Sequence, residues 1–445
     1  MTDKRVFLQK LLQEAKHFGA TDADALMVSS TAVSVQVRNA HPEELERSET
    51  NIIGLRVFKD KRSATISTTD FDKKNITRLV EKANSMAKIL PEDPYTGLPY
   101  PSAKPIVSPE QLDLYDPTEH PTSTMLEWAK EAESAALSVK GVSNSVGGSY
   151  AFCKKEITLA NSKDFFGSYT HTNHSISACV LAGSGVDMQR DYDYHSAIYF
   201  EDLENPSEIG KNAGERAVAK LNPTKPKTGV FPVIFHPRVA RSLIEHLANG
   251  VNGSSVTKGS SFLQDSMGKV IFPPSITVID QPYKARGLGS IPFDSEGLFP
   301  ETINLIKQGK LVNWLLDFRS AKQLGLNSNG HASRGVSSAP FPSPTNLYVM
   351  PSTHTPEELM QDIKEGIYVT ELIGSSVNML TGDYSRGASG FKIRNGTIAE
   401  PIVEFTLASN LIDMFSKLHV ANDLEFRYHV NSPTIRIDDM SIAGD

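Results

Sequence analysis

The sequence predicts an α+β protein with two lobes, an N-terminal α/β region followed by a glycine-rich, β-dominated C-terminal domain. Apolar residues recur every three or four positions in some segments and alternate with polar residues in others, which is typical of amphipathic helices and half-buried strands. After residue 229 the composition changes, and glycine and short apolar runs become frequent. Prolines and glycines gather between these regions and mark their boundaries.

Residues 1–90 are predicted to form an α+β module. The polar run Lys59-Asp60-Lys61-Arg62 separates two of its apolar segments and is typical of a turn between strands. The expected order is a helix at 4–19, strands at 24–37, 52–58 and 63–68, and a helix at 72–89.

Residues 91–121 carry many prolines, which remove backbone donors and fix φ, so this stretch is predicted to be an extended connector. Residues 122–222 follow as a central β-rich region with flanking helices. Its expected elements are helices at 122–139 and 208–221, a hairpin of 156–161 with 165–182, and a strand at 194–200.

A second boundary falls at 222–229, where prolines and a glycine interrupt the chain. Residues 229–445 are predicted to form the C-terminal domain, which opens with a buried strand at 230–235. His236-Pro237 then begins a helix that extends to 250, because proline is well suited to a first helical position. Apolar residues on this helix recur at three and four: Ala240, Leu243, Ile244, Leu247 and Val251.

The composition excludes several classes of protein. The 445 residues include 45 Lys and Arg and 52 Asp and Glu, so the formal charge is 45 − 52 = −7, which disfavours nucleic acid as a partner. No apolar run approaches the roughly 20 residues that span a bilayer, and the first residues do not resemble a secretory signal. Cys153 and Cys179 form no CxxC pair, so a disulfide framework is not expected. We therefore expect a cytoplasmic protein without direct contact to nucleic acid or membrane.

The histidines do not form a sequence-local metal site. His171 and His174 are three apart in an alternating segment, so they face opposite sides of a strand. Neither HExxH nor GxSxG occurs. Glu245 and His246 are adjacent on the helix at 237–250, where neighbouring side chains diverge by about 100° and cannot jointly grip one ion. A solvated surface pair is the ordinary interpretation of these two residues.

The segment 380–391 is the least ordinary part of the chain. Its glycines and small residues permit close approach of another backbone, and Asp383 and Arg386 can pair to fix a loop. Such a loop suits a ligand whose main chain is gripped, and a tight structural turn is the alternative. The residues predicted to bind substrate are Gly382, Asp383, Tyr384, Arg386, Gly387 and Gly390.

Several short motifs lie in a defined order in the C-terminal domain. They are the stretches at 253–256, 260–268, 292–297, 314–317, 320–326, 369–372, 381–391, 408–411 and 441–444. Together they resemble the TldD/PmbA family of metallopeptidase-complex proteins, which are also described as modulators of DNA gyrase. The resemblance spans about 230–445, and the first 220 residues resemble the family more weakly, in 67–70 and 167–169.

The family has two branches that differ on one helix. One branch carries HExxxH on the helix after the first strand of the C-terminal domain and a cysteine near the C-terminus, which hold zinc, and the glutamate is the general base. At the motif positions this chain has Ile244, Glu245 and Asn249, and Asn431-Ser432-Pro433 stands in place of the cysteine. Isoleucine cannot bind a metal, and asparagine is a poor zinc ligand. The resemblance is therefore to the PmbA/TldE branch, and it implies that this chain binds no metal.

The resemblance implies the non-metal subunit of a cytoplasmic metallopeptidase complex that cleaves unfolded proteins or peptides, held as an added β-strand in a cavity. Zinc is expected on a TldD-like partner in a heterodimer, and a homodimer stays open. Glu245 would be the relic of a general base, and the segment 382–390 would shape the cleft. Two alternatives stay open: a self-sufficient hydrolase that joins Glu245 and His246 to a remote residue such as His331, and a non-catalytic regulator of the DNA gyrase modulator type.

Overall fold

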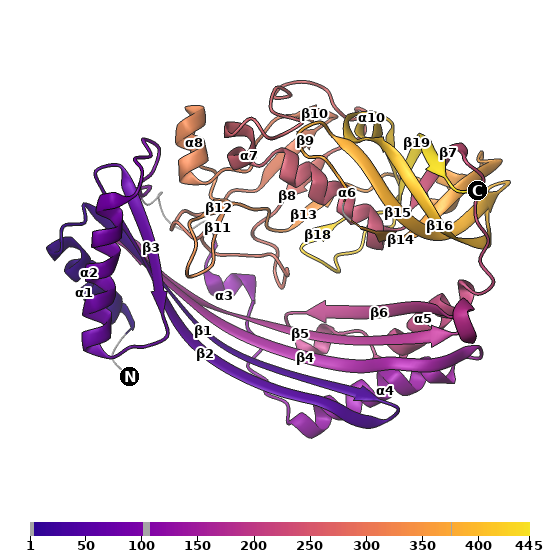
Figure 1. The fold of residues 1–445 in the computed structure, drawn as a ribbon, viewed down its shortest axis with the longest axis horizontal. Coiled ribbons are helices and arrows are strands. Elements are labelled where there is room, and N and C mark those ends of the chain that lie inside the picture. The colour runs from indigo at the N-terminus through magenta and orange to yellow at the C-terminus, as the bar shows by residue number, and fades with distance from the viewer. Residues whose placement is uncertain (1–3, 101–106, 375) are drawn as a thin grey trace.

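The computed structural model describes residues 4–100, 107–374 and 376–445. Residues 1–3 of the predicted first module and 101–106 of the predicted connector lie outside the described residues. A long curved sheet with its helices forms the lower lobe, and a lobe that contains a closed barrel lies above it (Figure 1). The fold is therefore the two-lobed α+β architecture that the sequence predicts.

An antiparallel sheet forms the lower lobe and joins the two regions predicted as 1–90 and 122–222. The domain boundaries drawn from the sequence stay predictions. The strand order is β3-β2-β1-β4-β5-β6. The strands are β1 (Asp22–Arg38), β2 (His41–Lys59), β3 (Arg62–Thr68), β4 (Val142–Asn161), β5 (Phe166–Ala182) and β6 (Gln189–Ala197).

Helices cover the convex face of this sheet near its two ends (Figure 1). The apolar faces of α1 and α2 pack on β1 to β3, and those of α4 and α5 pack on β4 and β5. Asp72 caps α2 and Asn205 caps α5, since each side chain accepts a backbone N–H of the first turn. The bounds are α1 (Lys4–His17), α2 (Lys73–Ile89), α3 (Pro109–Leu112), α4 (Thr122–Ser138), η1 (Gly185–Asp187), η2 (Phe200–Asp202) and α5 (Pro206–Ala219).

The upper lobe is built on a closed barrel. β14 lies parallel to β7, β15 and β16 follow antiparallel, and β19 pairs with both β16 and β7 to close the ring. β17 continues the sheet beside β19. The bounds are β7 (Gly229–Phe235), β14 (Glu365–Ile373), β15 (Asp383–Arg394), β16 (Thr397–Asn410), β17 (Leu418–Val420) and β19 (Ile435–Ala443).

Helix α6 (Pro237–Gly250) lies between the barrel and a second, smaller sheet of order β10-β9-β8-β13-β18. The apolar side chains of all three meet in the largest hydrophobic cluster of the upper lobe. The sheet strands are β8 (Val278–Asp280), β9 (Ile303–Lys307), β10 (Lys310–Leu311), β13 (Leu347–Val349) and β18 (Val430–Asn431). Short elements complete the lobe: α7 (Gly253–Thr257), α8 (Phe318–Leu324), β11 (Ala332–Ser333), β12 (Phe341–Pro342), α9 (Pro356–Met360) and α10 (Leu411–Ser416).

The structure extends or corrects several predicted elements. β2 begins at His41, not at 52, and residues 41–47 pair with β1. The sequence pattern does not indicate this part of the strand, because its side chains are exposed on both faces and show no apolar alternation. The strand expected at 194–200 is β6, which ends at Ala197. The segment 381–391, predicted as a loop, is mostly the first part of β15, where it pairs with both β14 and β16. Among the described helices, none is long and apolar enough to cross a membrane.

Candidate functional site

Helix α6 is the element on which the sequence places the motif positions. Pro237 occupies its first turn, and the side chain of His236 caps it by accepting the backbone N–H of Arg238 at 3.2 Å. One face of the helix is fully buried in the hydrophobic cluster, and Leu243 and Ile244 have no exposed surface. Arg241 and Glu245, one turn apart, project from another face and remain partly exposed.

Glu245 is held by arginine. Nη1 of Arg241 lies 2.5 Å from Oε1 of Glu245, and the same guanidinium stacks 4.5 Å above the ring of Tyr428. His429 follows this tyrosine, and burial lowers its pKa against the opposing charge of Glu245. The carboxylate therefore forms a partly exposed ion pair on the helix surface.

The donor set does not fit a zinc ion. Ile244 is an aliphatic side chain that points into the core, and Asn249 is exposed on the last turn of α6. The side chain of Asn431 is engaged within the protein, since its Oδ1 accepts hydrogen bonds from the backbone N–H groups of Arg427 and Tyr428. Within the described residues, no group of three His, Cys, Asp or Glu side chains could hold a metal ion.

His246 lies on a different flank of α6, against β15. Its ring centroid is 6.1 Å from that of Tyr384, and the charge of Arg386 lies close to both side chains. Burial, and to a smaller extent the positive charge of Arg386, lowers the pKa of His246 to about 4, so the imidazole is neutral near pH 7. His246 Nε2, Tyr384 Oη and Arg386 Nε are buried and have no hydrogen-bond partner in the described part of the chain. The sequence singled out Tyr384 and Arg386, and the structure adds His246 to them.

The predicted pair of Asp383 and Arg386 does not form. Asp383 accepts hydrogen bonds from the hydroxyl of Thr381 at 2.6 Å and from the side chain of Asn410 at 3.2 Å. Residues three apart in a strand face opposite sides of the sheet, so Asp383 is exposed whereas Arg386 shares the inner face with Tyr384. The pairing prediction failed because it assumed a loop at this position.

The glycines of this segment have different structural reasons. Gly382 adopts φ +84°, a left-handed conformation that favours glycine. At Gly390 a Cβ would come within 1.9 Å of the carbonyl oxygen of Tyr368, so close pairing with β14 requires glycine there. At Gly387 the nearest atom, Cβ of Ile373, would lie 3.4 Å away, which is an ordinary contact. Gly387 is therefore the glycine whose absence of a side chain the fold itself does not explain, and its role in substrate binding stays a prediction.

Three neighbouring cavities lie between the lobes, and we call their row the interlobe groove. Cavity A has a volume of about 280 Å³, cavity B about 440 Å³ and cavity C about 400 Å³. Strands β1, β4, β5 and β6 supply the floor, and the upper lobe supplies the roof. Cavities A and B share Gly289, Pro344 and Thr345, and cavities B and C share Tyr194, Arg241, Arg427 and Tyr428.

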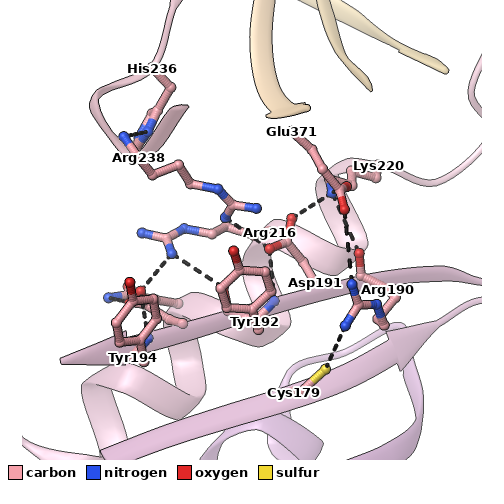
Figure 2. A network of polar contacts seen from close by, with 12 residues as sticks. Cys179, Arg190, Asp191, Tyr192, Tyr194, Arg216, Lys220, His236, Arg238 and Glu371 are labelled. Atoms are coloured by element: carbon pink, nitrogen blue, oxygen red, sulfur yellow. Dashed lines mark hydrogen bonds and ion pairs between the residues drawn. The ribbon is translucent and has the colours of Figure 1, made fainter. Parts of the chain in front are cut away.

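A buried ionic junction fixes the lobes beside cavity C (Figure 2). Lys220, at the end of α5, lies 2.8 Å from carboxylate oxygens of both Asp191 on β6 and Glu371 on β14. Arg238 of α6 binds Asp191 at 2.9 Å and stacks 4.9 Å from the ring of Tyr192. Burial by itself would raise the pKa of Asp191, but Arg238 and Lys220 hold it below its usual value. The junction therefore ties β6 and α5 of the lower lobe to α6 and β14 of the upper lobe.

The groove residues were missed by sequence reasoning. Arg241, Arg427 and Tyr428 lie at its centre, yet none belongs to a recognisable motif. The available signal was weak: Arg241 is one turn before Glu245, a spacing that permits an ion pair on a helix. Arg427 and Tyr428 come from a different part of the chain, and their neighbours follow from the tertiary fold alone.

The two-lobed fold and the altered motif helix together define a class of metallopeptidase-related proteins. Models of the PmbA/TldA metallopeptidase family match the chain throughout: domain 1 at residues 23–87, the central domain at 115–221 and the C-terminal domain at 228–444. The chain belongs to this PmbA/TldD family, as the resemblance implies.

Similar proteins extend over almost the whole chain. A protein of Escherichia coli named metalloprotease PmbA is 36% identical over 98% of this chain and 97% of its own length, and a Haemophilus influenzae homologue is 33% identical over 95% and 92%. Among solved structures, a Bacteroides thetaiotaomicron protein, named for a proposed role as a modulator of DNA gyrase, has a TM-score of 0.91 at 24% identity, with full coverage of both chains. TldE of Thermococcus kodakarensis has a TM-score of 0.85 at 20% identity and covers 98% of this chain and 99% of that chain. These two structures support the fold.

Proposed function

We propose that this chain is the non-metal subunit of a cytoplasmic peptidase complex that cleaves unfolded proteins or peptides. The observation that carries the proposal is Ile244, which stands fully buried at a motif position where the metal-binding branch has a histidine. Relatives with 36% and 33% identity are named metalloproteases, which supports a peptidase-related role for a chain that lacks the ligands. The zinc would then be on a TldD-like partner, and Glu245 would be a relic of the general base.

The interlobe groove is the proposed binding surface for the extended substrate. Cavities A, B and C follow one another and have tyrosine and arginine side chains along their walls. An extended chain offers backbone donors and acceptors at every residue, so polar side chains along a groove bind it with little demand on sequence. The ionic junction at Lys220 holds the lobes at a set spacing, which lowers the ordering cost of binding.

A self-sufficient hydrolase is less well supported. His331 hydrogen-bonds to Asp280 through Nε2 at 3.1 Å and to the carbonyl of Asn329 through Nδ1, and it lines cavity A. Glu245 pairs with Arg241 near cavities B and C. No hydrogen bond or ion pair in the described residues links His331 to Glu245 or His246, so the three proposed residues are not assembled as a unit.

A regulator of the DNA gyrase modulator type is the second candidate, because a solved structure with a TM-score of 0.91 carries that name. The formal charge of −7 opposes direct contact with DNA but not with a protein. This role requires gyrase binding without any need for the groove. It predicts that variants in the groove leave the regulatory effect unchanged.

Reconstitution tests the proposal. The chain is purified alone and together with a TldD-like chain, and each species is assayed for zinc and for cleavage of an unfolded polypeptide. We expect cleavage in the co-purified complex and in neither chain alone. Tyr428→Ala, in cavities B and C, should weaken cleavage, whereas Tyr100→Ala, at an exposed site, serves as the matched control. Full activity of the isolated chain, or a complex indifferent to Tyr428→Ala, would contradict the proposal.

A further inference from the structure

Cavity A differs from its two neighbours in the character of its walls. Strands β1, β4 and β5 supply aliphatic and aromatic side chains from below, and segments near 291 and 332 close it from above. Its volume of about 280 Å³ is near the lower end of the roughly 300–1,000 Å³ of small-molecule pockets, so it suits one large side chain. The apolar lining includes Leu26, Val28, Ile157, Leu159, Ile291 and Phe293.

The wall of cavity A is firmly held. Leu26, Leu159, Phe165 and Phe293 form one hydrophobic cluster that joins the lower sheet to the upper lobe. The rings of Phe165 and Phe293 meet edge to face at 5.2 Å. Gly289 packs so closely on the neighbouring segment of the upper lobe that a Cβ there would come within 2.3 Å of the carbonyl oxygen of Thr345. A preformed apolar cavity of this kind gains affinity from burial without much rearrangement.

A charged cluster lies at the base of cavity A and is satisfied largely within the protein. Arg56 binds Asp24 Oδ2 at 2.8 Å through Nε, and Arg334 binds Oδ1 of the same carboxylate at 2.6 Å. Asp294 accepts the backbone N–H groups of Glu296, Leu298 and Ala332. Asp294 and Arg334 both line the cavity, so a charged side chain of either sign would meet a like charge beside the opposite one, and apolar walls that cannot hydrate it.

We propose that cavity A is a side-chain pocket that accepts one bulky apolar residue of the substrate peptide and excludes charged residues. The inference rests on the proposed function and deepens it, because it assigns the peptide a sequence preference. Burial of a leucine or phenylalanine side chain provides the affinity. Cavity A adjoins cavity B at Gly289, Pro344 and Thr345, so the rest of the peptide extends along the groove.

The apolar side chain could belong to the last residue of a peptide or to an internal one. Arg334 and Ser295 line the cavity, and Arg334 Nε and Nη1 and Ser295 Oγ are buried without a hydrogen-bond partner among the described residues. The carbonyl oxygen of an internal residue brings a neutral acceptor to this side of the cavity, whereas a terminal carboxylate would bring a charge of the kind that the cavity excludes. Peptides with the apolar residue in each position distinguish the two sources.

Binding of fluorescent peptides to the full-length isolated chain, read by anisotropy, tests the proposal. One peptide series varies a single position among Leu, Phe, Gly, Asp and Lys, and is made with that position either terminal or internal. We expect Leu and Phe to bind at least ~10-fold more tightly than Asp or Lys. Equal binding of the whole series in both positions would overturn the pocket while leaving peptide binding, and so the proposed function, intact. Absence of any peptide binding would overturn both.

Variants of Val28 locate the effect. Val28→Trp fills the cavity from β1 and leaves every residue of the charged cluster unchanged, and it should reduce the preference for Leu over Asp to within about 2-fold. Val230→Trp, at an exposed position on β7, is the matched control and should leave the preference unchanged. If Val28→Trp fails to fold, Val28→Ser takes its place and should weaken Leu binding selectively. An unaltered preference in a folded Val28 variant would overturn the assignment to cavity A.

Discussion

Nη1 of Arg241 lies 2.5 Å from Oε1 of Glu245, one turn away on α6. The pair is partly exposed, with 36% of the Glu245 side chain accessible, and the guanidinium also stacks on Tyr428. By pairing with Arg241, the carboxylate helps to fix the position of a side chain that lines the groove.

Glu245→Gln removes the charge and keeps the shape of the side chain. Because the carboxylate is paired with Arg241 and has no metal ligand at Ile244 or Asn249 beside it, we expect cleavage by the reconstituted complex to stay within a few-fold of the wild type. Steady-state kinetics on an unfolded substrate measures this. The equivalent change in the HExxxH glutamate of the partner is the positive control and should cost about 10²-fold or more. A similar loss for Glu245→Gln would favour the self-sufficient hydrolase.

The purified chain should hold no stoichiometric zinc. Zinc requires imidazole, thiolate or carboxylate ligands, and the motif positions offer an isoleucine and an asparagine around one carboxylate. Elemental analysis after gel filtration measures the content, and the partner chain provides the comparison. About one tightly held zinc per chain would disprove this prediction.

Gly387 and Gly390 should respond differently to a side chain. Gly390→Val places a Cβ 1.9 Å from the carbonyl of Tyr368, so we expect loss of folding or a destabilisation above about 3 kcal/mol. Gly387→Val meets Ile373 at an ordinary 3.4 Å, so that variant should fold and bind its partner. We expect it to weaken substrate processing through a contact outside the interlobe groove, since residues 382–390 line none of cavities A, B and C. Thermal denaturation, co-purification and cleavage assays separate the effects, and normal cleavage by Gly387→Val would rule out a substrate wall at this position.

Lys220→Met should destabilise the protein by about 3 kcal/mol, near the lower end of the cost of breaking a buried ion pair, because Arg238 still compensates Asp191. The Lys220 side chain is only 5% exposed, and its loss leaves Glu371 without its nearest cation. Urea denaturation measures the change. Lys211→Met removes an exposed pair with Glu215 and serves as the control, with little expected effect. Equal stabilities of the two variants would show that the junction contributes little.

The contribution of this junction should vanish in acid. Burial opposes ionisation of Asp191 and of Glu371. Arg238 and Lys220 nevertheless hold the pKa of Asp191 below its usual value, and Lys220 does the same for the pKa of Glu371. A carboxyl group with a lowered folded pKa contributes stability that is present above its unfolded pKa, about 4, and is lost as the pH falls through the folded value. The difference in unfolding free energy between the wild type and Lys220→Met should therefore be constant from pH 7 to 5 and shrink below about pH 4. A difference that stays constant down to pH 3 would contradict this assignment.

Local patterns in the sequence predicted much of the fold. The apolar spacing at 237–250 gave the bounds of α6 because an amphipathic helix repeats every 3.6 residues, whatever it packs against. Polar residues at 59–62 and 161–164 indicated the turns that connect β2 with β3 and β4 with β5. The outer half of β2 could not be predicted in this way, because its side chains are exposed on both faces.

The candidate site was predictable only in part. Tyr384 and Arg386 stand out in a glycine-rich segment, but the same composition suits a loop or a strand, and pairing with β14 and β16 selects the strand. In a strand, Asp383 and Arg386 face opposite sides of the sheet, so the expected pair between them cannot form. His246 joins Tyr384 across 138 residues of sequence, a contact that no local spacing encodes.

The α+β class and the family, and the expectation that Ile244 and Asn249 replace zinc ligands, follow from the sequence, because they depend on residue identity and short-range periodicity. The interlobe groove, the junction at Lys220 and the apolar pocket depend on tertiary contacts. Arg334 reaches Asp24 across 310 positions, and Lys220 reaches Glu371 across 151. Such contacts form when the folded lobes bring remote segments together, and the free energy that places them comes from burial over the whole molecule.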